Sequence, residues 1–491
     1  MLRRYKKLPF NTPPITPRKP PETVRYVSTP YASMAPPEVL LPIFQALGPT
    51  VYTDAFAYPP YRTKHQSFAY FDEAVVYSGP NLTDLVSVAL VCRSWNASAV
   101  AVLYARPFIF SHRRLQQFYR TLQHNTELGT LVTHLYVFTQ QCEQAKSRSF
   151  LQSNQDSKDR HRARTTLISS ILLCPKLTFL LLTNRDRKKS VVLPLDAAFI
   201  RSCSLEHRLR SLTIYGSALW TTRGVSPLIS PDLFLPALEV LILREVTFHG
   251  GLSFPIFPRL HSLQLTRCTY MQTPFGEPRA TRVPPFLLTT ENFPTVHTLL
   301  LYENYCTIDL SEELTGNLKE LHCVGADLSR PALWPMNFAP PLLRRLVTSL
   351  VSATNNSLSE TLPPSLQELT LILITESDLR GVAALANKIR LAVSAHSCPQ
   401  ALSLAQLRSV TIIEQVADAS VMMGTIVAAM LSDPEFQEIA PDRWVRASMM
   451  PVVVELNELG IACEENGVRF SYNVCTRSFL AKWIGHQLTP R

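Results

Sequence analysis

The sequence predicts an α/β protein in which a short N-terminal helical domain precedes an irregular solenoid built around a parallel sheet. Three observations lead to this prediction. An apolar-x-x-apolar-x-apolar triplet recurs through most of the chain, two amphipathic segments precede it, and 38 prolines against 15 glycines indicate many short elements. The 491 residues are 46% hydrophobic, which is enough apolar material for a sizeable core.

Residues 1–33 are expected to form a disordered, basic, proline-rich arm. The first 30 residues carry seven Lys and Arg against one Glu, a charge of 7 − 1 = +6 out of +10 for the chain. Such a composition buries too little apolar surface to offset the entropy of ordering. The rest of the chain is nearly balanced in charge, so no specific nucleic-acid surface is predicted.

Residues 34–110 are predicted to form the helical domain, from two short amphipathic helices. Pro36 and Pro37 suit a first helical turn, and Glu38 suits its positive end. Apolar residues then recur at helical spacing in both segments: Leu40, Ile43, Phe44 and Leu47, and later Leu85, Val88, Cys92, Trp95, Ala99 and Val102. An insertion rich in Tyr and Phe at 48–81 separates the helices; an irregular surface excursion is favoured over a partner-binding loop.

Residues 111–413 are predicted to form the solenoid. The triplets begin at residues 132, 177, 209, 238, 260, 296, 318, 343, 366 and 407, with spacings of 22, 22, 25 and 23 in the most regular part. These spacings are typical of leucine-rich repeats, whose strands stack into a parallel sheet and share one core. The alternative is a set of unrelated strands in an ordinary α/β domain. The polar stretch 140–164 is expected to be a solvated loop.

Residues 414–491 are predicted to be a C-terminal capping region, because the triplet pattern ends before them. The Ala- and Met-rich segment 417–431 is expected to be helical. Residues 461–472 are expected to form a hairpin that turns at Asn466-Gly467, a pair typical of two-residue β-turns.

No pattern in the sequence predicts catalysis. The ten cysteines are scattered without a Cys-x-x-Cys pair, and the common nucleotide-binding, hydrolase and zinc-protease motifs are missing. No cofactor, no metal and no enzymatic activity are therefore expected. No apolar run is long enough to span a bilayer, and scattered cysteines suit a reducing compartment, so the expected location is cytoplasmic or nuclear.

The two amphipathic segments resemble the F-box of eukaryotic F-box proteins. The resemblance lies in Pro36-Pro37-Glu38-Val39-Leu40 and in Val91-Cys92-Arg93-Ser94-Trp95, which continues into Leu103-Tyr104-Ala105-Arg106-Pro107 as in the F-box proteins abundant in fungi. The family implies a substrate receptor of an SCF-type ubiquitin ligase, which acts as a monomer within a complex. The residues that would contact or support a Skp-type adaptor joined to a cullin are Pro37, Leu40, Ile43, Phe44, Leu85, Val91, Cys92 and Trp95.

In a solenoid, residues that flank the buried strand positions face the concave side and are candidates for binding a protein substrate. The candidates are Tyr215, Arg244, Gln264, Tyr302 and His322. A second interpretation remains open: the chain is a ligase-independent scaffold, and the helices only cap the repeat array.

Overall fold

The structure is a computed structural model. It describes residues 36–47, 82–109, 112–139, 153–184, 197–215, 233–244, 246–249, 254–266, 268–271, 286–302, 308–324, 340–350, 363, 365–374, 386–387, 389–391, 393, 406–416 and 443–476. The predicted N-terminal arm, the insertion at 48–81 and the predicted helix at 417–431 lie outside these residues.

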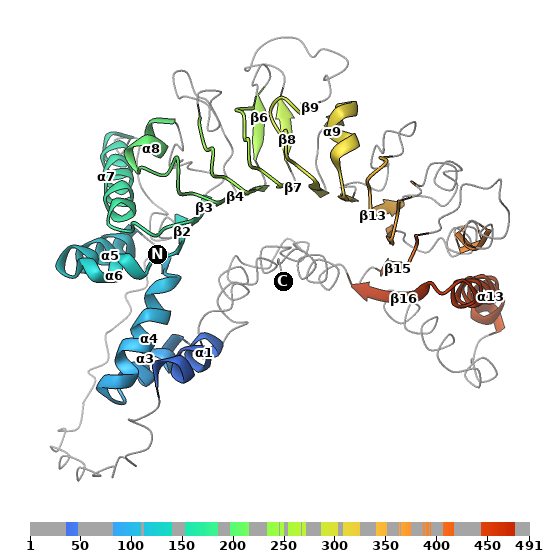
Figure 1. Ribbon diagram of the computed structural model, residues 1–491, viewed down its shortest axis with the longest axis horizontal. Coiled ribbons are helices and arrows are strands. Elements are labelled where there is room, and N and C mark those ends of the chain that lie inside the picture. Colours follow the sequence, from blue (N-terminus) through green and yellow to red (C-terminus); the bar gives the residue numbers. More distant parts are fainter. Residues whose placement is uncertain are drawn as a thin grey trace, which may run out of the picture.

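A parallel sheet of 12 strands organises the fold, and each of its strands pairs with the member of this sheet that follows it along the chain. The strands lie along the inner side of an arc (Figure 1). Their bounds are β1 Phe108–Ile109, β2 His134–Thr139, β3 Phe179–Asn184, β4 Ser211–Tyr215, β5 Val240–Arg244, β7 Ser262–Thr266, β10 Thr298–Tyr302, β12 Glu320–Val324, β13 Arg345–Leu350, β14 Glu368–Ile374, β15 Ser409–Val416 and β16 Arg469–Thr476. The predicted α/β class with a parallel sheet is confirmed.

The triplets set the register of this sheet. Their second positions are opposite one another on neighbouring strands and form one buried row: Leu135, Leu180, Leu212, Leu241, Leu263, Leu299, Leu321, Leu346, Leu369 and Val410. The third positions form a parallel row two residues further on, because alternate side chains of a strand share a face. The first positions are also buried and anchor the turn into each strand. These rows build one continuous core.

Two small parallel sheets and most of the helices lie on the outer side of the arc (Figure 1). The small sheets pair β6 Thr247–His249 with β8 Thr269–Met271, and β9 Phe286–Leu288 with β11 Ile308–Leu310. The helices after the N-terminal group are α5 His112–His124, α6 Thr126–Leu131, α7 Ser153–Leu172, α8 Ala197–Ser202, α9 Glu312–Asn317 and α13 Arg443–Glu465.

Helix α7 corrects one prediction. The stretch expected to be a solvated loop is helical from Ser153 onward. Its apolar positions, Leu167 and Ile171, are fully buried, but they lie beyond residue 164, the end of the polar stretch. The first half of the helix is polar, so the helical period becomes visible only in the second half.

The C-terminal part corrects another. Residues 461–465 end α13 rather than begin a hairpin, and β16 runs parallel to β15. Gly467 has a positive φ of 69°, its N–H bonds to the carbonyl of Glu464, and the N–H of Val468 bonds to that of Cys463. This is the Schellman arrangement that ends helices. An Asn-Gly pair is typical of a two-residue hairpin turn and also of a helix C-terminus, because glycine readily adopts a positive φ. The predicted hairpin is wrong, and the pair ends a helix instead.

The sheet also extends past both boundaries drawn from the sequence. β1 lies inside the segment 34–110 that is predicted to form the helical domain, and it pairs with β2. At the other end β15 runs to Val416, and β16 belongs to the segment predicted as a cap. The helical and C-terminal segments therefore both contribute strands to the same sheet.

Candidate protein-interaction surfaces

Three of the described helices form a small unit with a core of its own: α1 Pro37–Leu47, α3 Leu82–Ala89 and α4 Arg93–Ala105. The second helix predicted from the sequence is therefore two helices, which a turn at residues 90–92 separates. Leu40 and Phe44 are 3% and 1% exposed and pack with Ala99 of α4. The ring of Phe44 meets that of Trp95 edge to face, with centroids 5.7 Å apart. The side-chain amide of Asn96 donates to the carbonyl oxygen of Ala89 at 2.9 Å, which fixes the start of α4 against the end of α3.

The same unit exposes several apolar side chains. Ile43 is 51% exposed and Leu90, in the turn after α3, is 79% exposed. Single exposed apolar residues are normal on protein surfaces, but several within one small unit are typical of a partner-binding surface. We call this set the apolar helical surface; it consists of Val39, Ile43, Val86, Leu90 and Val91.

The structure separates the residues that the F-box resemblance singles out. Leu40 and Phe44 are core residues, and Cys92 and Trp95 are half-buried. Pro37, Ile43 and Val91 are exposed, and the side chain of Leu85 lies outside the described residues. Three members of the surface were not predicted as contact residues from the sequence: Val39, Val86 and Leu90. Val39 is apolar and lies four residues before Ile43, a helical spacing that could have identified it.

The helical unit is joined to the first strands of the sheet. Both the backbone N–H and the hydroxyl of Thr133 donate to the carbonyl oxygen of Ala105, each at 3.1 Å. The N–H of Tyr136 donates to the carbonyl of Pro107 at the same distance. The unit therefore lies at one end of the arc, as Figure 1 shows.

The inner face of the sheet differs from the expected open binding surface. Arg244 and His322 are only 4% and 1% exposed. Gln264 is partly exposed and donates to the hydroxyl of Thr266 at 3.2 Å. The side chains of Tyr215 and Tyr302 lie outside the described residues. Among the described residues, the middle row of this face is thus largely buried.

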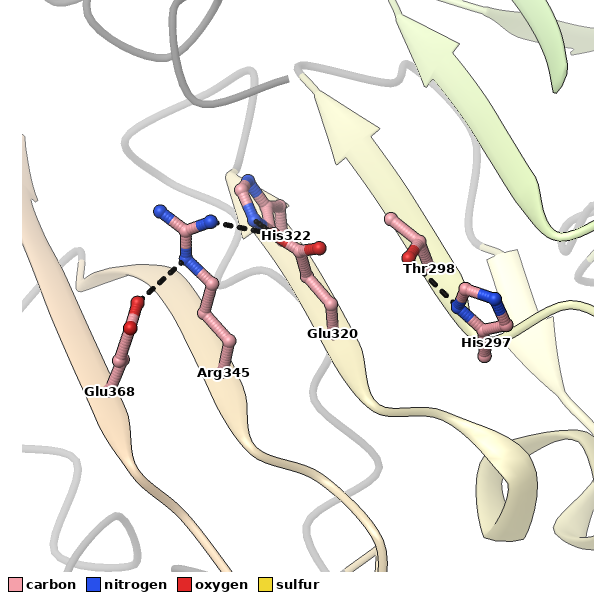
Figure 2. Close-up of polar contacts among 6 residues, drawn as sticks. All are labelled: His297, Thr298, Glu320, His322, Arg345 and Glu368. Carbon is pink, nitrogen blue, oxygen red and sulfur yellow. Dashed lines mark hydrogen bonds and ion pairs between the residues drawn. The ribbon is translucent and has the colours of Figure 1, made fainter. Parts of the chain in front are cut away.

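A charged cluster spans three adjacent strands of the inner face (Figure 2). The carboxylate of Glu320 accepts from Nη1 of Arg345 at 3.0 Å and from Nε2 of His322 at 2.9 Å. Nε of Arg345 lies 3.2 Å from a carboxylate oxygen of Glu368. Glu320, Arg345 and Glu368 are opposite one another in the strand register. One arginine on β13 therefore bridges the carboxylates of the two strands that flank it, β12 and β14.

The pKa values of this cluster are set by burial and by its hydrogen bonds. Burial alone would raise the pKa of Glu320, but its hydrogen bond with His322 and the charges of His322 and Arg345 lower it below its usual value. Burial lowers the pKa of His322, although Glu320 acts in the opposite direction. A charged carboxylate and a neutral imidazole are consequently the favoured states near neutral pH.

Two further histidines lie beside this cluster at the strand edge. The rings of His261 and His297 stack with centroids 5.5 Å apart, and Nδ1 of His297 lies 3.2 Å from the hydroxyl of Thr298 (Figure 2). Burial, followed by the neighbouring His261 and Lys319, lowers the pKa of His297. In the part of the chain that the structure describes, no three His, Cys, Asp or Glu side chains are grouped as metal ligands.

Comparisons with known proteins do not identify a family for this chain, so its function is inferred from the surfaces described above. No protein-family model matches the chain, and no curated protein is significantly similar to it. Within the described ranges, no helix combines the length and the apolar character that crossing a bilayer requires.

Proposed function

We propose that the chain is the substrate-recognition subunit of an SCF-type cullin-RING ubiquitin ligase. The observation that carries the proposal is the apolar helical surface, which lies on a unit with its own core and with the Val91-Cys92-Arg93-Ser94-Trp95 string. Helices that leave an apolar face unpaired bind partners by burying that face. The partner proposed is a Skp-type adaptor, which links the chain to a cullin.

In this proposal the chain carries out no chemistry itself, and ubiquitin transfer belongs to other subunits. The helical unit docks the adaptor, and the leucine-rich-repeat-like solenoid holds a protein substrate. The sheet and the helical unit have separate hydrophobic cores, which supports this division of roles. The site of action is the cytoplasm or nucleus, with the chain as a monomer within the complex.

The scaffold interpretation keeps one specific observation in its favour. The bonds from Thr133 to Ala105 tie α4 to the segment that enters β2, as a cap on a repeat array would be tied. Helices that only cap a repeat array need no exposed apolar side chains, whereas Ile43 and Leu90 are exposed. Adaptor docking therefore remains the preferred function.

The test uses exposed residues, because charges at Leu40 or Phe44 would unfold the helical unit and abolish binding for that reason alone. We expect the intact chain to co-purify with a Skp-type adaptor and cullin, and Ile43→Asp with Leu90→Asp to abolish this. Gln45→Asp, an exposed position on the same helix, is the matched control and should retain capture. Circular dichroism should show all variants folded.

Two results would overturn the proposal. One is an intact, folded chain that fails to capture the adaptor, which would leave the scaffold function. The other is unchanged capture by the Ile43→Asp, Leu90→Asp variant, which would place any contact elsewhere.

A further inference from the structure

A line of polar and mostly basic residues marks the edge where seven strands of the sheet begin. Each residue follows a buried apolar anchor, and each N–H donates to the carbonyl of its predecessor on the previous strand, at 2.7 to 3.2 Å. The line consists of His261, His297, Lys319, Arg344, Gln367, Arg408 and Arg469; the same bonding continues before it to Glu239 and Arg210, whose side chains lie 3.8 Å apart as an ion pair. Backbone bonds therefore fix the spacing of these side chains, independently of what the side chains themselves contact.

Four members of this line are cations with exposed side chains, which we call the basic edge: Lys319, Arg344, Arg408 and Arg469. The carboxylates nearest in the register, Glu320 and Glu368, are both within ion-pair distance of Arg345. Among the described residues, no acidic group is within ion-pair distance of any of the four. Within the described part of the chain, the basic edge thus carries positive charge without an acidic partner, whereas the two carboxylates of the row beside it share Arg345.

The length of the basic edge defines the size of ligand that it fits. Neighbouring strands of a sheet are about 4.8 Å apart, so the four steps from β12 to β16 span about 19 Å. An extended peptide rises about 3.3 Å per residue, so about six residues cover this distance. An extended chain of this length reaches all four cations.

The carboxylates beside the line favour an acidic peptide over a nucleic acid. A nucleic-acid backbone carries a negative charge on every nucleotide, so it would bring phosphates close to Glu320 and Glu368, which are one residue from the line and share a single arginine, Arg345. A peptide can place Asp or Glu opposite the cations and polar residues opposite the carboxylates. Gln367, between Arg344 and Arg408, offers an amide to such a polar residue.

We propose that the basic edge binds an extended, acidic segment of a protein partner. The inference rests on the proposed function only for the identity of that partner as the substrate; the binding itself needs no adaptor. The basic edge thereby defines a chemical class of substrate, namely proteins with an exposed acidic segment of about six residues.

The test measures fluorescence anisotropy of a labelled ten-residue peptide of alternating Asp and Ser, titrated with the full chain. We expect binding that weakens as salt rises, and none for the alternating Asn and Ser peptide. Arg344→Glu with Arg408→Glu should weaken binding about tenfold, because each reversal turns a weak attraction into a repulsion. Arg113→Glu with Arg120→Glu, exposed on α5, makes the same charge change elsewhere and should leave binding unchanged.

Three outcomes would overturn the inference. They are no binding of the acidic peptide, equal weakening by the α5 control, and displacement of the peptide by a uridine oligonucleotide of equal charge that binds more tightly. Adaptor capture distinguishes this failure from that of the proposed function. The Arg344→Glu, Arg408→Glu variant should still capture the adaptor, because the helical unit is unchanged.

Discussion

Gly129 in α6 is a position where a single methyl group should destabilise the fold. A Cβ built there would lie 1.9 Å from the backbone carbonyl oxygen of Leu173 and 3.0 Å from its carbon. That carbonyl cannot rotate away, because Cys174, the next residue, bonds through its N–H to Ile171 and through its carbonyl to Arg208. Gly129→Ala must therefore push α6 and the end of α7 apart by about 1.5 Å to reach ordinary van der Waals contact at 3.4 Å.

The cost follows from two opposing effects. Overpacking of a fixed site costs roughly 1–3 kcal/mol, and the helix gains about 1 kcal/mol when Gly becomes Ala. Because both partners are backbone, we take the upper part of the first range and expect a net loss of about 2 kcal/mol. Gly316→Ala in α9 is the matched control: nothing lies within 4 Å of its Cβ, so it should gain up to about 1 kcal/mol.

Urea unfolding, followed by circular dichroism on the full chain, measures both variants. We expect a lower urea midpoint for Gly129→Ala and an equal or higher midpoint for Gly316→Ala, relative to the parent. A Gly129→Ala protein as stable as the parent would refute the close approach of α6 to α7. Equal destabilisation by both variants would show that the effect belongs to glycine in helices generally.

Three more predictions concern the buried polar groups. Burial, followed by the charge of Arg106, lowers the pKa of His134 to about 4, so the folded state binds fewer protons than the unfolded state below pH about 6.5. The urea midpoint should thus fall as pH drops from 7 to 5, and less so in His134→Gln. Arg208 donates to the carbonyls of Cys174, Ile171 and Cys203, so Arg208→Met should lower stability by about 2–3 kcal/mol, measured by urea unfolding; an unchanged midpoint would contradict this role. Burial raises the pKa of the Cys174 and Cys203 thiols to about 12, so iodoacetamide at pH 8 should label them only after unfolding, as mass spectrometry of the digested protein would show.

The repetitive part of the fold could be predicted from the sequence because its physics is local. A triplet such as Leu260, Leu263 and Leu265 fixes the anchor and the buried face of one strand without information from elsewhere in the chain. The non-repetitive parts could not. The polar first half of α7 hides its period, and Asn466-Gly467 suits both a hairpin and a helix end. Only the packing of Val468 into the core decides for the helix end.

The candidate surfaces were less predictable because exposure depends on tertiary contacts. The spacing of Ile43 and Phe44 shows that both belong to an amphipathic helix, yet one is exposed and the other is buried against Trp95. His322 sits on the inner face as its strand position predicts, but its burial removes it from the accessible surface. The basic edge could not be predicted because its residues are far apart in the sequence, and the bonds between strands align them.

The most direct test of the proposed function is hydrogen–deuterium exchange of the full chain with and without a saturating Skp-type adaptor. The account predicts added protection in α1, in α3 and in the turn through Leu90 and Val91, with no change in β5 to β16. Protection confined to the sheet, or no protection anywhere at saturating adaptor, would contradict it.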